Sequence, residues 1–355
     1  MNDRERFLAV LNFEEPDQYP LVEFMGFWPE VKTAWVKQGF PPKADIFEHF
    51  GIIEPKYIPI NFNFVPPFEE KVLEDTEHHQ IVIDETGVTK KIEKNSSAMP
   101  HYVDFPIKKR ADFEALKDRL DPLDYKNRYP QNWPQLVAEY KNRTSPLGLV
   151  IRGPFAFCRD FMKFEDMMMT VYDDRKLIED MMALQIDFII KLWQKVLADM
   201  EVDFVYIGED MAYKTGPMFS PAMCTQLLKP LYTKLTSALK SMGVKNIFLD
   251  SDGHVTDLIP LYIESGMTAI LPLECTAGMD IVQVRQQYPN LQLIGGVDKM
   301  NIAQGDEGIK EELRRVSQII RKGGYIPSFD HSVPPIVSLE NYTKCIDGLK
   351  EILAS

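Results

Sequence analysis

The sequence lacks the features that mark secreted and membrane proteins. Its four cysteines are far apart, no two form a CxxC spacing, and a chain of 355 residues does not need disulfide bonds to stabilise its core. No apolar run approaches the roughly 20 residues that cross a bilayer, and the first residues follow a helical rather than a signal-peptide pattern. We therefore expect a cytoplasmic protein without a membrane segment.

Positive charge is also scarce. The chain has 40 Lys and Arg residues against 53 Asp and Glu residues, a formal net charge of −13, and no stretch of four or more consecutive basic residues. This balance would repel a phosphate backbone. We therefore expect a small-molecule substrate and no nucleic-acid partner.

From residue 145 onward, short apolar runs alternate with long amphipathic segments, which is typical of βα units and a parallel sheet. The expected strands are residues 147–153, 203–210, 246–253, 269–274, 291–298 and 323–331. The expected helices are residues 173–199, 221–242, 255–266, 279–288, 301–321 and 338–352. This order predicts an α/β fold, which we interpret as one domain over residues 1–355.

The N-terminal part follows another pattern. It has an expected helix at 3–12 and a candidate strand at 19–25. Residues 69–93 are typical of an antiparallel pair or meander, with a turn at DETG between two alternating runs. We interpret 69–93 as a β insertion and 94–110 as a linker-like stretch.

Ionisable residues end the late apolar runs. They are Arg152, Glu209, Asp210, Asp250, Asp252, Glu274, Asp298, Lys299, Asp330 and His331. In a closed parallel barrel, the carboxyl ends of all strands open on one face, where barrel enzymes place their chemistry. An open doubly wound sheet would also gather ligands there, but its glycine-rich phosphate turn is lacking.

Asp250 and Asp252, in FLDSDGHV, lie one residue apart and would point to the same face of a strand. Such carboxylates raise each other's proton affinity unless a cation, a metal or a shared proton relieves them. With His331 and either Glu209 or Asp210, they could supply three or four ligands to a zinc-like ion. Alternatively, Asp252 caps the following helix, and Glu209 and Asp210 bond the amides of the loop after them.

Three segments resemble uroporphyrinogen decarboxylases. LQLIGGVDKMNIAQG looks like that family's Gly-Asn-Leu-Asp-Pro strand and helix, and GGYIPSFDHSVPPIVSLENY resembles its segment with an active-site histidine. RERFLAVLNFEEPDQYP is similar to its opening helix and turn. The resemblance spans nearly the whole chain, and it implies a (β/α)8 TIM barrel, often dimeric, here with the insertion at 69–93.

The decarboxylases of this superfamily have an Arg-Gln-Ala-Gly-Arg motif whose arginines hold substrate carboxylates. The corresponding stretch here, EFMGFWPE, has no arginine, and Glu23 and Glu30 would repel such a substrate. The family's tyrosine falls near Asp160. Of the decarboxylase residues, only His331 is retained.

The other branch contains zinc methyltransferases that act with corrinoid proteins. Their His-x-Cys pair aligns with Asp250 and Asp252, and their distant Cys aligns with His331. An Asp/Asp/His set leaves the metal a stronger Lewis acid, suited to an oxygen or nitrogen substituent. The resemblance therefore favours methyl transfer linked to a corrinoid protein or cobalamin, with Zn²⁺ at Asp250, Asp252, His331 and Glu209, and Asp210 as a further catalytic residue.

Alternatives remain open. A cofactor-independent decarboxylase acting on uroporphyrinogen or a smaller acid would use Arg152, Arg159, Lys214 or Lys299 in place of the missing arginines. A glycosidase pair is disfavoured by the order of the motifs, and a non-catalytic binding protein is the fourth interpretation. In the leading interpretation, substrate contacts come from Arg152, Asp160, Glu274, Asp298, Lys299 and Asp330.

Overall fold

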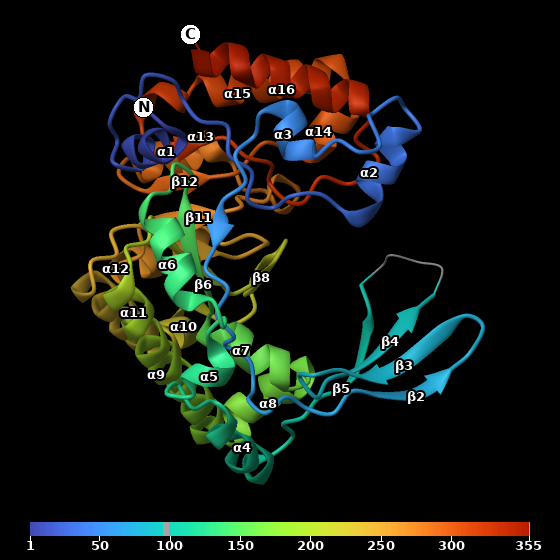
Figure 1. Cartoon of the computed structure of the whole chain (residues 1–355), viewed down its shortest axis with the longest axis vertical. Helices are drawn as coiled ribbons and strands as arrows, with labels where there is room; N and C mark the ends of the chain where they lie inside the picture. Colours follow the sequence, from blue (N-terminus) through green and yellow to red (C-terminus); the bar gives the residue numbers. More distant parts are fainter. Residues whose placement is uncertain (95–98, 355) are drawn as a thin grey trace.

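The computed structural model describes residues 1–94 and 99–354. Its centre is a curled parallel sheet of seven strands with helices outside it (Figure 1). In spatial order the strands are β1 (Lys56–Tyr57), β6 (Leu147–Arg152), β7 (Phe204–Gly208), β10 (Ile247–Asp250), β11 (Ala269–Leu271), β12 (Gln292–Ile294) and β13 (Tyr325–Ile326). The predicted βα alternation after residue 145 is confirmed, although each strand ends earlier than its apolar run.

The helices before β6 are α1 (Asp3–Leu11), α2 (Pro29–Val36), α3 (Ile46–Phe50), α4 (Arg110–Leu116), α5 (Tyr125–Arg128) and α6 (Trp133–Lys141). Those after it are α7 (Pro154–Phe161), α8 (Phe164–Asp173), α9 (Arg175–Asp199), α10 (Pro221–Leu227), α11 (Lys229–Ser241), α12 (Ile259–Glu264), α13 (Ile281–Gln287), α14 (Lys299–Ala303), α15 (Asp306–Ser317) and α16 (Leu339–Ala354). Two predicted helices are each divided in two. A new helix begins at Lys229 within 221–242, with Pro230 in its first turn, and Gly305, at φ 91°, interrupts 301–321.

The predicted strand at 19–25 is not a strand. Val22 forms only an isolated parallel bridge with Ile53. Glu23 instead joins this segment to the chain after β13, because its carboxylate accepts hydrogen bonds from the amides of Met25 at 2.8 Å and Phe329 at 3.0 Å. Burial raises the pKa of Glu23 to about 7. Glu23 therefore joins two distant segments of the fold.

The amino ends of the strands are filled by aromatic rings. Phe204 and Phe248 stack with their centroids 5.0 Å apart, and Phe7 from α1 lies 5.7 Å from Phe204. Gly148 makes room for this cluster, since a Cβ there would lie 2.4 Å from the Phe204 ring. This end of the sheet is closed by packing, so a polar site must lie at the carboxyl ends.

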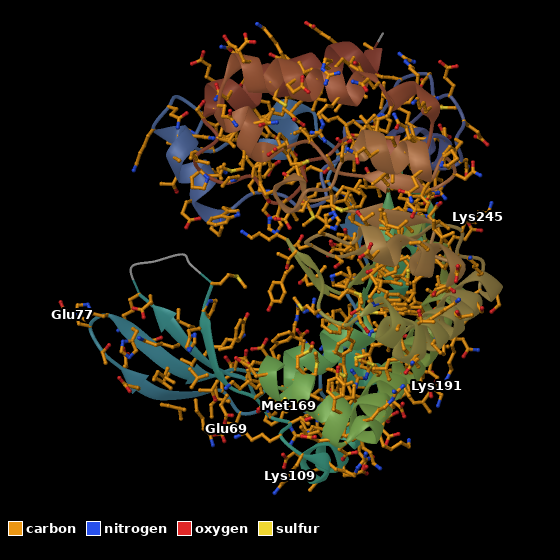
Figure 2. All side chains as sticks on the ribbon, turned by 180° about the vertical axis from the view of Figure 1, so that it is seen from behind. Glu69, Glu77, Lys109, Met169, Lys191 and Lys245 are labelled. Carbon is orange, nitrogen blue, oxygen red and sulfur yellow. The ribbon has the colours of Figure 1, made fainter. Side chains whose placement is uncertain are left out.

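The insertion is an antiparallel sheet in the order β2 (Lys71–Asp75), β3 (His79–Ile83), β4 (Thr89–Glu93) and β5 (His101–Asp104). The DETG turn is confirmed, with the Asp84 carboxylate accepting from the Thr86 amide at 2.9 Å. The stretch 94–110 is not a simple linker, because it contains β5, while residues 95–98 lie outside the described residues. The sheet projects away from the parallel strands, and no residue of its four strands is buried (Figures 1 and 2).

Among the described residues, no helix is both long enough and apolar enough to pass through a lipid bilayer.

Candidate active site

Three neighbouring strands bring Arg152, Gly208 and Asp250 to one level. Gly208 is the register partner of Arg152 on β6 and of Asp250 on β10. Gly208 has no side chain to separate them: a Cβ added there would lie 3.6 Å from Nη1 of Arg152 and 3.9 Å from Oδ2 of Asp250. The missing side chain at the end of β7 therefore leaves a space between the Arg152 guanidinium and the Asp250 carboxyl group.

Asp250 is the acid at the centre of this end of the sheet. Burial raises its pKa well above the ordinary value, and the nearby carboxylates of Asp210 and Asp252 add to the increase. The hydroxyl of Tyr206 donates a hydrogen bond to the Asp250 carboxyl group and opposes part of this effect. Oδ1 of Asp250 is buried without a hydrogen-bond partner. The structure thus favours a protonated acid with one oxygen available.

His331 and Asp252 form the next pair, as their assignment to one site predicted. Nε2 of His331 lies 3.2 Å from Oδ2 of Asp252. Nδ1 accepts a hydrogen bond from the Ser332 amide at 2.8 Å, so in the neutral ring the proton is on Nε2, facing Asp252. The hydrogen bond to Asp252 raises the pKa of His331. The side chains of His331 and Asp252 are 34% and 32% exposed, so this pair, whose charges act on Asp250, is open to solvent.

Glu209 lies elsewhere than predicted. Side chains alternate along a strand, so Tyr206 and Gly208 face the inside of the sheet, and Glu209 faces the helices. Its carboxylate accepts from the Ala156 amide in the first turn of α7 at 2.7 Å and from the hydroxyl of Tyr232 on α11. Burial raises the pKa of Glu209 to about 7. Glu209 therefore caps a helix, and the structure does not bring it together with Asp250, Asp252 and His331.

The remaining strand-end residues mostly serve backbone groups. Asp298 caps α14 through the Met300 amide at 2.8 Å, and Glu274 accepts from the Gly253 amide at 2.8 Å. Asp330 is fully buried; it accepts from the Cys275 amide at 2.9 Å and from the ammonium group of Lys299 at 3.1 Å. These residues surround the carboxyl ends of the parallel strands, which we call the mouth of the sheet, as predicted. Their carboxylates, however, are largely hydrogen-bonded to other groups of the protein.

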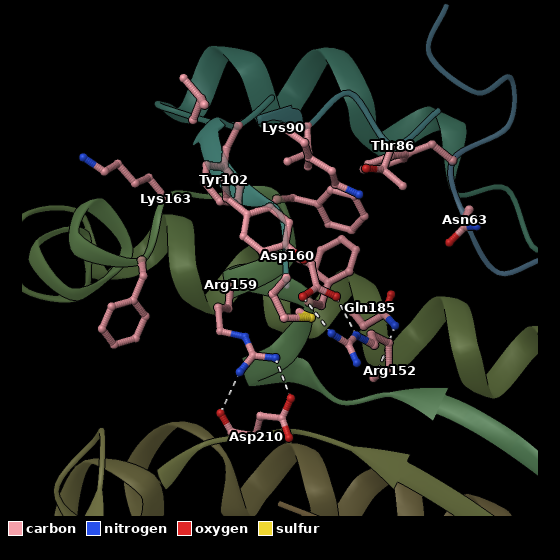
Figure 3. Close-up of a pocket in the computed structure, with 18 of the residues that line it drawn as sticks. Asn63, Thr86, Lys90, Tyr102, Arg152, Arg159, Asp160, Lys163, Gln185 and Asp210 are labelled. Atoms are coloured by element: carbon pink, nitrogen blue, oxygen red, sulfur yellow. Dashed lines mark hydrogen bonds and ion pairs between the residues drawn. The ribbon is translucent and has the colours of Figure 1, made fainter. Parts of the chain in front are cut away.

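A pocket of about 860 Å³ opens beside this mouth, between the insertion sheet and α7–α8 (Figure 3). Arg152 and Asp210 line its inner end. Arg152 donates to Asp160 through two nitrogens, one at 2.7 Å, and Arg159 donates to the Asp210 carboxylate at 3.0 Å and to its carbonyl oxygen at 2.8 Å. The volume is in the range that small-molecule sites occupy.

Metal binding was the main prediction for this site. Asp250 and Asp252 each have a buried oxygen without a partner, which is what a cation would relieve. However, Glu209 is occupied, and both ring nitrogens of His331 already have partners. Within residues 1–94 and 99–354, no three His, Cys, Asp or Glu side chains are grouped to hold one metal ion. As arranged, the side chains do not fit a zinc site.

Sequence reasoning missed Tyr206 and the walls of the pocket. Tyr206 carried a signal, because it is a polar ring on the inward face of an otherwise apolar strand, two residues before Gly208. The sequence gives no signal for the wall residues Lys90 and Tyr102, since they line the pocket only because of where the insertion sheet packs.

A curled parallel sheet with polar groups at its carboxyl edge is the arrangement of α/β-barrel enzymes. The family model described as uroporphyrinogen decarboxylase (URO-D) matches residues 80–352, and the chain belongs to this family. A methyltransferase from Methanosarcina mazei has the same fold, with a TM-score of 0.67, 15% identity and 100% of both chains covered. A B12-independent methionine synthase from Shewanella sp. W3-18-1 has a TM-score of 0.45 and 10% identity, with 94% of this chain and 97% of that chain covered. No curated protein matches the sequence.

Proposed function

We propose that the protein is a methyltransferase that removes a methyl group from an oxygen or nitrogen atom of a small molecule, with Asp250 as the acid for the leaving atom. The observation that carries this proposal is the partner-free oxygen of a buried, proton-binding carboxyl group near Arg152 and Asp210, which line a substrate-sized pocket. Expelling an oxygen or nitrogen anion is difficult, and a positioned acid lowers that barrier.

The reaction needs one proton for each methyl group. As the bond from carbon to the leaving atom breaks, its electron pair stays on that atom, which takes the proton of Asp250. The Tyr206 hydroxyl positions the carboxyl group through their hydrogen bond. His331 and Asp252, at the solvent side, return a proton to Asp250.

The methyl acceptor in this proposal is a reduced corrinoid, carried by a partner protein or supplied as free cobalamin, which provides a strong nucleophile. Zinc dependence stays a prediction from the resemblance, and no step here uses it. Metal analysis of the purified protein and of Asp250→Ala and His331→Ala variants tests that prediction separately.

Decarboxylation is the second candidate, because the family includes decarboxylases. It would need cations free to bind substrate carboxylates. Of the four cations considered for this role, Arg152, Arg159 and Lys299 are each already bonded to a protein carboxylate, and Lys214 is exposed and does not line the pocket. This pairing is why we rank decarboxylation below methyl transfer; tight binding of coproporphyrinogen would reverse the order.

The direct test is Asp250→Asn, which keeps the shape and removes the acid. With reduced cobalamin and a panel of methoxy and N-methyl compounds, we expect the rate of demethylated product formation to fall about 10²- to 10⁴-fold. Asp257→Asn is the matched control, because Asp257 is exposed and lies outside the mouth. An Asp250→Asn variant as active as the control would refute the proposed role of Asp250.

A further inference from the structure

The insertion sheet forms one wall of the pocket. Thr86, Lys90, His101, Tyr102 and Val103 line the pocket from this sheet and its turn, and the opposite wall comes from α7 and α8 (Figure 3). None of the strand residues is buried, so the sheet contributes little core. Its clearest contribution to the molecule is this wall.

The pocket is rich in aromatic side chains. Phe62, Phe105 and Phe164 are half-buried around it, and Tyr102 is 43% exposed. The rings of Tyr102 and Phe105 lie 6.2 Å apart, within the range of aromatic pairs. Behind them are the buried rings of Phe64, Phe157 and Phe161. Such walls favour a flat, aromatic ligand.

The charges of the pocket are paired within the protein. Arg152 is bonded to Asp160, Arg159 to Asp210, and Lys90 to Asp84. Lys163 lies 3.9 Å from Glu165. A charged ligand would have to compete with these existing partners, so the pocket suits an uncharged one.

Two residues that line the pocket lie near Asp250. Asp210 lines the pocket, and its charge acts on Asp250. Arg152 also lines the pocket; its Nη1 lies 3.6 Å from the position that a Cβ of residue 208 would take, and Oδ2 of Asp250 lies 3.9 Å from the same position. A ring held between the two walls can therefore direct a substituent over Gly208 to the acid.

We infer that the pocket binds an uncharged aromatic methyl ether, with the ring between the insertion sheet and α7–α8 and the ether oxygen toward Asp250. This inference rests on the proposed function for its chemistry. The bond from the methyl carbon to the ether oxygen breaks, and the oxygen keeps the electron pair and takes the Asp250 proton to give a phenol. A reduced corrinoid accepts the methyl group.

Calorimetric binding of three probes to the full chain tests the ligand class without turnover. We expect 2-methoxyphenol to bind at least about tenfold tighter than cyclohexyl methyl ether, which has no flat ring, and than 2-methoxybenzoate, which is charged. Tyr102→Ala and Phe105→Ala should each weaken 2-methoxyphenol binding about 3- to 10-fold. Tyr172→Ala is the matched control, because Tyr172 is 72% exposed on α8 and does not line the pocket.

The outcomes separate the two proposals. Equal affinity for the three probes, or binding unaffected by both wall variants, overturns the pocket inference even if aliphatic methyl donors are demethylated. Binding as expected with no demethylation in the presence of reduced cobalamin supports the pocket and overturns the proposed function.

Gly208 allows a second test of the path to the acid. Its backbone is outside the left-handed region, so Gly208→Ala and Gly208→Val are compatible with the strand. We expect Val to lower demethylation at least about tenfold more than Ala, because its larger side chain fills the space over Gly208. Unchanged rates in both variants would contradict the path over Gly208.

Discussion

The ends of β7 and β10 each carry a buried acid, and the surroundings of the two acids are opposite. On the helix side, the Glu209 carboxylate accepts from the Ala156 amide and the Tyr232 hydroxyl. On the inner side, Asp250 has one oxygen without a partner and faces Arg152 across Gly208. Burial raises the pKa of both acids, so a raised pKa alone does not separate them. The partner-free oxygen distinguishes an acid available for chemistry from one used for structure.

After the activity loss expected for Asp250→Asn, the largest expected difference between the two acids is in the stability of variants that lack them. Glu209→Ala leaves the Ala156 amide and the Tyr232 hydroxyl buried without an acceptor and opens a cavity. We expect the free energy of unfolding to fall by about 4 kcal/mol. Asp250→Ala deprives no backbone amide of its acceptor and leaves only the Tyr206 hydroxyl without one, so we expect a smaller loss, of about 1 kcal/mol. Urea denaturation measures both, and equal losses would remove the distinction.

The next effect is the pH dependence of stability. Burial raises the pKa of Glu209 from 4.5 to about 7, so the folded chain binds this proton more tightly than the unfolded chain. The resulting stabilisation is complete below about pH 4.5 and is lost as the pH rises through about 7. Between these values, the wild type should lose on the order of 2 kcal/mol relative to Glu209→Gln. Denaturation curves of both proteins across this range provide the measurement, and a constant difference would show that the Glu209 pKa is not raised.

The smallest effect concerns the outer pair. Because the hydrogen bond to Asp252 raises the pKa of His331, Asp252→Asn should lower it. Glu274→Gln is the comparison variant, since Glu274 acts on His331 only through its charge and should lower the pKa less. NMR titration of the His331 ring protons measures both shifts. An unchanged pKa in Asp252→Asn would mean that the pair does not persist in solution.

The mouth of the sheet was predictable from the sequence, because polar residues that follow parallel strands meet at one edge. The grouping of Asp250, Asp252 and His331 followed from this rule. The orientation of Glu209 required one further step. Because side chains alternate along a strand, Glu209 points to the side opposite to that of Gly208 and Tyr206. Without a defined strand end, adjacent Glu209 and Asp210 could not be assigned to opposite sides.

The pocket was not predictable, because it depends on contacts between segments far apart in the chain. Tyr102 belongs to β5, a four-residue strand inside a stretch that reads as a linker. Phe105 and Phe164 are ordinary apolar residues in the sequence. Only the packing of the insertion sheet against α7 and α8 makes them neighbours in one cavity.

The bond between Glu23 and Phe329 has a consequence for how the chain is made. Glu23 is translated 306 residues before Phe329, whose amide it binds. Until then, the carboxylate must stay in water, because burying it without this donor is unfavourable. The segment around Glu23 therefore docks only after Phe329 has been translated, and in a nascent chain this contact is still missing while the middle strands already pack together.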